Sequence, residues 1–339
     1  MYEIAPRSFL SGLFVLVVLF LSGCNGSDRD RHEDVVSTRY IHKYGYDVSE
    51  KEWKHAEYPG RVVTKLRDGI TVTASYEEGV LHGTVTRTYP HSHTLESSIV
   101  YERGVPVRKT LYTPRGIPDR EEIFYSSDHK KVTRWYGSGT PLSTEEWRGD
   151  RLVSGEYYDT CNESEAHVAQ GFGVRIVRNA HEQREMRETI EEGRPVLREI
   201  YYPHGVPRAV IPLQGGVVHG EKKVFAPSGE PVAYETYRCD VLHGPATYFR
   251  NGCKYLEISY EEGRKHGTER HFVDGVTLVE ETEWRDGHKH GPSVLYFDDM
   301  SRVRYYYNNL AVSKEKYREL LRQEETIATM NNRAKGVDG

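Results

Sequence analysis

The sequence is poor in apolar residues and in net charge, and each shortage excludes a class of protein. Hydrophobic residues make up 37% of the 339-residue chain, below the usual range of globular domains, which implies no large enzyme core. The formal net charge is −5, so no concentrated basic face for nucleic acid is indicated. Motifs for a serine nucleophile elbow, a phosphate loop, a zincin helix or a dinucleotide turn are also absent. We therefore expect neither an enzyme nor a nucleic-acid-binding protein, and no cofactor.

Glycine and tyrosine are abundant instead, and a turn signal recurs along the chain. With 31 glycines, 25 tyrosines and 29% charged residues, the composition is typical of a thin, well-solvated β structure. Tight-turn residues recur every 23 or 24 residues, at Gly45, Gly69, Ser92, Gly116, Gly139, Asn162, Gly205, Gly229, Gly252, Gly275 and Asp299. The double interval from Asn162 to Gly205 leaves room for one degenerate unit. Such a period indicates a repeat array, so we expect function on a long surface rather than in a cleft.

The clearest unit runs from Tyr237 to Tyr260 and contains Asn251-Gly252 between two strand-like runs. An Asn-Gly pair in this context predicts a two-residue type I′ hairpin turn, and Asp274-Gly275 is its equivalent one unit later. The predicted register pairs Arg250 with Cys253, Phe249 with Lys254, Tyr248 with Tyr255 and Thr247 with Leu256. One face would then carry Phe249, Thr247, Leu256, Ile258 and Tyr260, and the other Tyr248, Tyr255, Ala246, Glu257 and Arg250.

The second connection of each unit has the signature Tyr/Trp-x-x-Gly-x-x-His-Gly. It occupies residues 76–83, 260–267 and 284–291, and Asp240 replaces the first glycine before Val241-Leu242-His243-Gly244. The signature resembles the MORN repeat, in its bacterial variant, over roughly residues 40 to 310. This resemblance implies a single-layer ribbon of stacked antiparallel hairpins. Many bacterial members are classed as antitoxins, and eukaryotic relatives are linked to membranes and scaffolding.

The N-terminus is typical of an exported lipoprotein. An apolar run from Phe9 to Leu21 is too short to span a bilayer comfortably, and Leu21-Ser22-Gly23-Cys24 closes it. The tetrapeptide resembles the lipobox of bacterial lipoproteins, which implies removal of a signal peptide at 1–23 and acylation of Cys24. A plain secretory signal and an uncleaved anchor helix are the alternatives.

The segment after Cys24 is expected to be a tether. Residues Asn25 to Asp34 contain no apolar side chain, so we predict a disordered linker at 24–38 between the membrane and the first repeat. In lipoproteins of this type an aspartate after the lipidated cysteine favours inner-membrane retention. Because Asn25 stands there instead, the resemblance implies attachment to the bacterial outer membrane.

The repeats are predicted to occupy residues 39–312 and to end at a helix, 313–334. Ser313 is placed to cap this helix, and Tyr317, Leu320 and Leu321 lie close to one stripe of it. A helix here would cover the open edge of the last hairpin, which otherwise recruits other strands.

Two recurring sets of polar residues are better explained by turns than by chemistry. The histidines His219, His243, His266 and His290 are each one repeat apart, which corresponds to roughly 10 Å, whereas ligands of one zinc ion each lie near 2 Å from it. Glu-Glu-Gly sequences recur at the turns of 77–79, 191–193 and 261–263, as solvated turn charge does.

Three cysteines remain once Cys24 is assigned to lipidation, which are Cys161, Cys239 and Cys253. In the predicted register Cys239 and Cys253 lie roughly 20 Å apart, beyond the reach of a disulfide. We predict no bond between them.

The sequence therefore predicts an all-β, elongated, single-layer hairpin array anchored in the membrane, with a non-catalytic surface that binds an unidentified protein partner. Tyr248, Tyr255 and Tyr296 are the candidate contact residues, because tyrosine is enriched at binding centres. The opposing explanation is that such aromatics pair across strands and hold the sheet together. The alternative functions are a glycan- or phospholipid-headgroup-binding module and an antitoxin-like neutralising protein. The polar segment from Cys161 to Gln183 is expected to be the weakest part of the array, where it bends or opens first.

Overall fold

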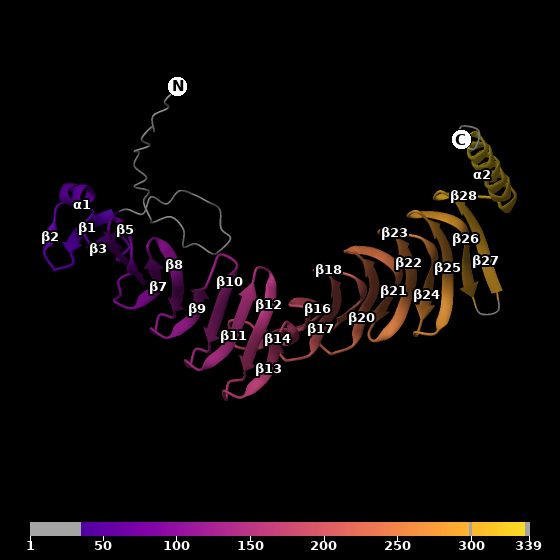
Figure 1. Ribbon diagram of the computed structural model, residues 1–339. Helices are drawn as coiled ribbons and strands as arrows, with labels where there is room; N and C mark the ends of the chain where they lie inside the picture. The colour runs from indigo at the N-terminus through magenta and orange to yellow at the C-terminus, as the bar shows by residue number, and fades with distance from the viewer. Residues whose placement is uncertain (1–34, 298–299, 336–339) are drawn as a thin grey trace, which may run out of the picture.

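The computed structural model describes residues 35–297 and 300–335. Within them the chain forms one open antiparallel sheet, with a short helix near its start and a longer helix at its end. Figure 1 shows the strands side by side along an elongated arc, with the first strands at one tip and helix α2 at the other. The prediction of an elongated all-β hairpin array with a C-terminal helix is confirmed.

The strands of the first half are short and closely spaced in the sequence. They are β1 (Val35–His42), β2 (Asp47–Val48), β3 (Gly60–Leu66), β4 (Thr71–Glu77), β5 (Val80–Leu81), β6 (Gly83–Thr88), β7 (Leu95–Glu102), β8 (Val105–Tyr112), β9 (Pro118–Phe124), β10 (His129–Trp135), β11 (Pro141–Arg148), β12 (Arg151–Tyr158), β13 (Ser164–Ala169) and β14 (Phe172–Arg178).

The second half continues in the same way and ends in longer strands. They are β15 (Arg184–Glu191), β16 (Arg194–Tyr201), β17 (Pro207–Gln214), β18 (Val217–Val218), β19 (Gly220–Phe225), β20 (Pro231–Arg238), β21 (Val241–Arg250), β22 (Cys253–Glu261), β23 (Arg264–Lys265), β24 (Gly267–Val273), β25 (Thr277–Arg285), β26 (His288–Phe297), β27 (Met300–Tyr307) and β28 (Leu310–Val312).

The sheet is a meander in which the longer strands pair in sequence order, while β2 lies on the outer side of β1. The two-residue strands β5, β18 and β23 pair only with the strand before them, so that β4, β17 and β22 also pair with β6, β19 and β24. Turns of successive repeats are also bonded to one another. The amide of Gly263 donates to the carbonyl of Leu242, and that of Gly287 to the carbonyl of Lys265, both at 2.8 Å. Each repeat is thus held to its predecessor by the strand ladder and by a turn-to-turn hydrogen bond.

The turn at Asn251-Gly252 is confirmed, but the predicted register beyond it is wrong. Asn251 and Gly252 have φ values of 51° and 74°, as a type I′ turn requires. Arg250 pairs with Cys253 and Phe249 with Lys254, but a β-bulge follows, so that Tyr248 pairs with Leu256 and Thr247 with Glu257. Tyr255 is the extra residue of the bulge. Tyr248 therefore shares a face with Leu256, Ala246 and Ile258 rather than with Glu257.

The turn at Asp274-Gly275 also differs from the prediction. Val273 pairs with Thr277, which leaves a three-residue connection instead of a two-residue turn. Asp299, the last predicted turn residue, lies outside the described residues.

The polar segment from Cys161 to Gln183 forms strands, although its sequence lacks the alternating apolar pattern of the other repeats. It contains β13 and β14, and its second turn has Glu182 at φ 64° in place of glycine, 20 residues after Asn162. β13 and β14 pair at only two positions, Val168 with Gly173 and Ala169 with Phe172, beside their connecting turn. The arc changes direction in this middle part (Figure 1).

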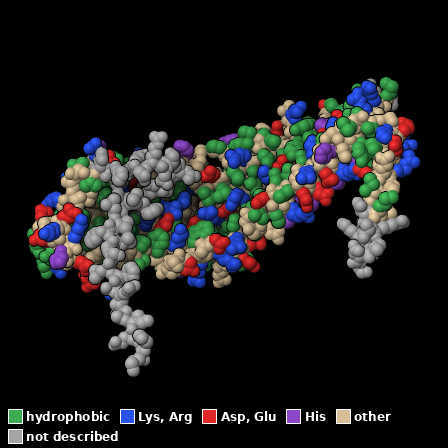
Figure 2. Space-filling view, turned by 90° about the horizontal axis from the view of Figure 1, so that it is seen from above, with side chains coloured by type: hydrophobic (Ala, Val, Ile, Leu, Met, Phe, Trp, Pro, Cys, Tyr) green, Lys and Arg blue, Asp and Glu red, His purple; other side chains and the backbone are tan. Residues whose placement is uncertain are grey.

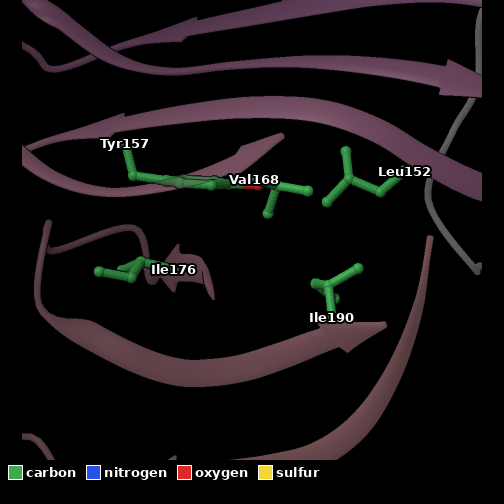
Figure 3. Close-up of a cluster of buried hydrophobic side chains, with 5 residues drawn as sticks. All are labelled: Leu152, Tyr157, Val168, Ile176 and Ile190. Carbon is green, nitrogen blue, oxygen red and sulfur yellow. The ribbon is translucent and has the colours of Figure 1, made fainter. Parts of the chain in front are cut away.

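Apolar packing replaces the missing ladder between β13 and β14. Val168 and Ile176 are 2% and 6% exposed and pack in one cluster with Leu152, Tyr157 and Ile190 (Figure 3). This cluster joins strands from β12 to β15. The segment expected to be the weakest therefore carries a buried core.

Two helices flank the array. Helix α1 (Glu50–Ala56) was not predicted; Ser49 and Glu52 form a capping box at its start, and Trp53 is buried. Helix α2 (Lys314–Lys335) matches the prediction, and Ser313 Oγ accepts the amide of Lys316 at 3.1 Å. Residues 35–38, predicted as part of the tether, belong to β1.

Candidate functional site

A row of aromatic side chains runs along one face of the C-terminal half. In each repeat the aromatic residue of the signature lies opposite the last glycine of the preceding signature. The pairs are Gly220 with Tyr237, Gly244 with Tyr260, Gly267 with Trp284 and Gly291 with Tyr306. Since directly paired residues share a face, and the ladders connect these pairs, all four rings lie on one side of the sheet. The last ring of the series is that of Tyr306.

Three lysines lie among these rings. The Nζ of Lys222 is 5.4 Å from the ring centre of Tyr237, and that of Lys265 is 4.6 Å from Trp284. The Nζ of Lys289 lies between two rings, 5.7 Å from Trp284 and 5.5 Å from Tyr306. Each such cation–π contact contributes about 0.5–1 kcal/mol at an exposed site. We refer to these seven residues, Tyr237, Tyr260, Trp284, Tyr306, Lys222, Lys265 and Lys289, as the aromatic–lysine row.

Carboxylates on the same face order part of this row. Glu235 accepts hydrogen bonds from Tyr237 and Tyr248, at 3.0 and 3.2 Å. Burial and the bond to Glu235 raise the pKa of Tyr237 to about 12. The ammonium groups of Lys222 and Lys265 lie 3.8 and 2.6 Å from Glu235 and Glu269. The phenol of Tyr237 therefore stays protonated at neutral pH and donates its hydrogen bond to Glu235.

Lys289 differs from the other two lysines. Within residues 35–297 and 300–335 it has no carboxylate within ion-pair distance, and only the rings of Trp284 and Tyr306 contact its ammonium. The indole Nε1 of Trp284 is buried and has no hydrogen-bond partner in the same described part. One cation and one N–H donor of the row are thus left without an acceptor.

The three tyrosines predicted as contact residues do not form one surface. Tyr248 lies on the face of the aromatic–lysine row, where its hydroxyl donates to Glu235. The ring of Tyr255, at the bulge, is 4.7 Å from the guanidinium of Arg250. Tyr296 lies on the opposite face and donates to Glu281 at 3.2 Å. The lysines of the row were missed, although Lys265 and Lys289 occupy the same position of the signature, directly before its histidine.

Other tyrosines hold the sheet together, as the opposing explanation expected. The hydroxyl of Tyr89 donates to the carbonyl of Tyr112, and that of Tyr136 to the carbonyl of Tyr158, both at 2.6 Å. Tyr202 makes the same bond to Phe225, at 3.0 Å. Each of these bonds links residues 22 or 23 positions apart, so these tyrosines bridge neighbouring repeats.

The signature histidines lie beside the turns. Nδ1 of His82 accepts the amide of Arg103, and Nδ1 of His243 that of Glu262, at 3.3 and 3.5 Å. His290 is 7% exposed and contacts Asn308 and the rings of Tyr307 and Tyr317. No group of three His, Cys, Asp or Glu side chains in the described ranges is placed to hold a metal ion. These histidines connect one turn to the next.

The cysteines Cys161, Cys239 and Cys253 are exposed free thiols. Cys239 precedes the ten-residue strand β21 and Cys253 follows it, so the two lie roughly 30 Å apart at about 3.3 Å per residue. This separation is larger than the predicted one of roughly 20 Å and is likewise beyond the reach of a disulfide. Leu21, Ser22, Gly23 and Cys24, the proposed lipidation motif, lie outside the described residues.

A buried ion network crosses the middle of the array. Arg175 on β14 contacts Glu145 on β11 at 2.8 Å and Glu188 on β15 at 3.0 Å, and Arg198 on β16 contacts Glu188 at 2.9 Å. Glu188 is 2% exposed. Burial raises the pKa of Glu145, but the hydrogen bonds and charge of Arg175, with hydrogen bonds from Tyr157 and Trp147, outweigh it and hold this pKa below 4.5. The network is structural, because its charges pair with one another.

Comparison with known proteins does not identify a family for the chain. Neither a family model nor a curated protein matches the chain. Among solved structures the chain is similar to part of the crystal structure of TcdB2-TccC3-Cdc42, with 10% sequence identity and a TM-score of 0.16. The alignment covers 82% of this chain and 14% of that chain, and this likeness carries no argument about function. No helix in the described part of the chain has the length and apolar character needed to span a membrane.

Proposed function

We propose that this is a lipid-anchored protein of the Gram-negative outer membrane, similar to MORN-repeat proteins, whose hairpin array binds a partner protein without catalysis. The observation that carries the proposal is the aromatic–lysine row, which repeats on one face at each signature. Aromatic residues are enriched at binding centres, and the ammonium of Lys289, which has no carboxylate within ion-pair distance among the described residues, can meet an acceptor of a partner. We assign the contact to this row rather than to Tyr248, Tyr255 and Tyr296 as a set.

Site-specific photocrosslinking in the envelope tests the contact face. A photoreactive phenylalanine analogue at Tyr306 is expected to capture a partner, whereas the same analogue at Tyr296, on the opposite face, is the matched control. A second variant, Lys289→Glu, should abolish the adduct formed from position 306. Equal adducts from both positions, or an adduct that survives Lys289→Glu, would contradict the assignment.

The anchor is tested separately. Cys24→Ala should leave an unprocessed or soluble protein, because the thiol that receives the lipid is lost. Metabolic labelling with a fatty-acid analogue measures this directly. Equal labelling of wild type and Cys24→Ala would reject the lipoprotein assignment and favour a plain secretory signal.

A second candidate function, binding of a linear glycan, is favoured by the spacing of the rings. Successive rings of the row are one repeat apart, or roughly 10 Å at about 4.8 Å per strand. The disaccharide unit of an extended β-1,4-linked glycan has nearly this length, and aromatic rings serve as stacking platforms for sugars. Cosedimentation of the unlipidated protein with purified peptidoglycan, lost in Trp284→Ala and kept in Tyr296→Ala, would select this function over protein binding.

A further inference from the structure

Strand β27 closes the sheet and is open along half of its length. Its inner side pairs with β26 from Met300 to Tyr306, but on its outer side β28 pairs only with Tyr305, Tyr306 and Tyr307. Residues 300–304 are all exposed. Helix α2, expected to cover this edge, packs through Tyr317 and Glu324 against the last residues of β27 and against residues near the turn before β26. Its contacts are Arg285, His290, Tyr305 and Tyr307.

Apart from its two arginines, this edge has few of the features that usually prevent strand addition: among the described residues, 300–304 are exposed and include no proline. Most hairpins of the array contain a β-bulge, whereas β26 and β27 pair without any register shift. An edge without bulge, proline or covering segment presents backbone donors and acceptors to another extended chain. At the other end of the array, β1 has a register irregularity after Val35, and its Arg39 is paired with Asp47 at 2.9 Å. Of these two edges, the C-terminal one pairs with its neighbour without a register shift, and its arginines have no ion-pair partner among the described residues.

The side chains of residues 300–304 of β27 determine which charge a segment bound at this edge must carry. Arg302 and Arg304 alternate on one face of β27, since they pair with Leu295 and Ser293. Neither arginine has a carboxylate within ion-pair distance among residues 35–297 and 300–335. Val303, on the other face, is 46% exposed. A second copy added antiparallel about Val303 would set Arg302 against Arg304 and place four guanidinium groups together, which disfavours self-pairing.

We propose that the open half of β27 binds an extended acidic segment of a partner protein by strand addition. Carboxylates at alternate positions of that segment face Arg302 and Arg304, and the residue between them contacts Val303. This site adjoins the aromatic–lysine row, because Arg304 and Tyr306 share a face of β27, but it rests on the open backbone edge and the two arginines and does not depend on the row. The occupant is a polypeptide, because its extended backbone can pair with the unpaired N–H and C=O groups of this edge.

Fluorescence anisotropy with a synthetic peptide tests the proposal. The probe is labelled Thr-Glu-Val-Glu-Val-Thr, titrated with the full chain in detergent at low and high salt. Binding is expected for the wild type, with a loss of at least about tenfold in Arg302→Glu with Arg304→Glu, because like charges then oppose each other. The matched control, Arg115→Glu with Arg208→Glu, changes the same net charge at exposed positions elsewhere and should bind as the wild type does.

A backbone-methylated form of the same peptide separates strand addition from charge attraction. N-methylation at alternate residues keeps the carboxylates but blocks strand hydrogen bonds, so this peptide should not bind. Equal binding of both peptides, equal loss in the control variant, or no binding by the wild type would overturn the proposal. Sedimentation tests self-association. If the wild type forms dimers and the Arg302→Glu, Arg304→Glu double variant does not, the edge binds a second copy of the chain instead.

Discussion

Arg175 shows how single residues stabilise a sheet that is one layer thick. It lies between Glu145 and Glu188, which are 8% and 2% exposed, and it connects strands that are not neighbours. A one-layer sheet cannot bury a wide apolar face, so hydrogen-bonded charges occupy part of its interior. Such a network is stable only while every member keeps its partner.

Removing this arginine should therefore be costly. Arg175→Met leaves the buried Glu145 without a cation and Glu188 with Arg198 alone, and we expect the free energy of unfolding to fall by about 3–5 kcal/mol at pH 7. Arg270→Met, which breaks the more exposed pair with Glu281, should cost less than about 1 kcal/mol. Urea denaturation measures both. A loss at position 175 no larger than that at position 270 would show that the network contributes no more than a surface pair.

The pH dependence of stability should reveal the same network. Because the folded-state pKa of Glu145 lies below 4.5, its contribution is complete above about pH 4.5 and is lost as the pH falls through the folded pKa. In Arg175→Met only the hydrogen bonds from Tyr157 and Trp147 still oppose the effect of burial, so the pKa of Glu145 rises and acid neutralises the buried carboxylate more readily. The difference in unfolding free energy between wild type and Arg175→Met should therefore shrink from pH 7 to pH 4. A constant or growing difference would contradict the assignment.

At the scale of elements, the turns were predictable because their chemistry is local. Asn251-Gly252 has the positive φ values that its sequence predicts, and Ser313 begins α2 as expected. The bulge at Tyr255 was not predictable, because it depends on how the hairpin fits its neighbours rather than on the turn. The turn at Glu182 and helix α1 were missed for different reasons. Glu182 carries no glycine signal, whereas the capping box Ser49-x-x-Glu52 was present and not used.

The turn itself is testable by one substitution and its control. Gly252→Val places a β-branched residue at φ 74°, and we expect a loss of roughly 1–2 kcal/mol in stability. A Cβ at this position meets nothing closer than 3.6 Å, so the cost is one of backbone conformation. Gly252→Asn should be nearly neutral, because asparagine tolerates this region. Thermal unfolding compares the two, and equal melting temperatures for wild type and Gly252→Val would reject the turn.

At the scale of the whole molecule, the junction between β13 and β14 should decide whether the array unfolds as one unit. Its ladder has two residue pairs, so coupling across it depends on the apolar cluster. Ile176→Ala, which removes about 2–5 kcal/mol of packing, should split the unfolding curve into two transitions. Ile99→Ala is the matched control, since β7 is paired at six positions on each side.

Hydrogen exchange during urea denaturation assigns the transitions. In Ile176→Ala the amides of residues 35–169 and 172–297 should lose protection at different urea concentrations, while in Ile99→Ala they should lose it together. A single transition in both variants would mean that the turn-to-turn hydrogen bonds couple the halves without the cluster.

The sequence predicted the array but only part of the candidate site. The period follows from turn residues, and the aromatic position of the signature was visible at Tyr260 and Trp284. Which aromatics share a face could not be predicted, because one bulge moves Tyr248 to the side opposite Tyr296. The open edge of β27 also depends on where α2 packs, and a stripe of Tyr317, Leu320 and Leu321 does not specify the surface that it meets.

The meander sets the distance between the two ends of the array. Because strands follow one another in sequence order, at about 4.8 Å per strand the pairings from β1 to β27 extend on the order of 100 Å along the arc. The two ends differ in what they carry, since the N-terminal end continues to Cys24 and the C-terminal end carries the regular edge. With the lipid anchor that we propose at Cys24, the array would act as a spacer whose reach is set by its number of repeats, and deleting one repeat would shorten that reach by roughly 10 Å.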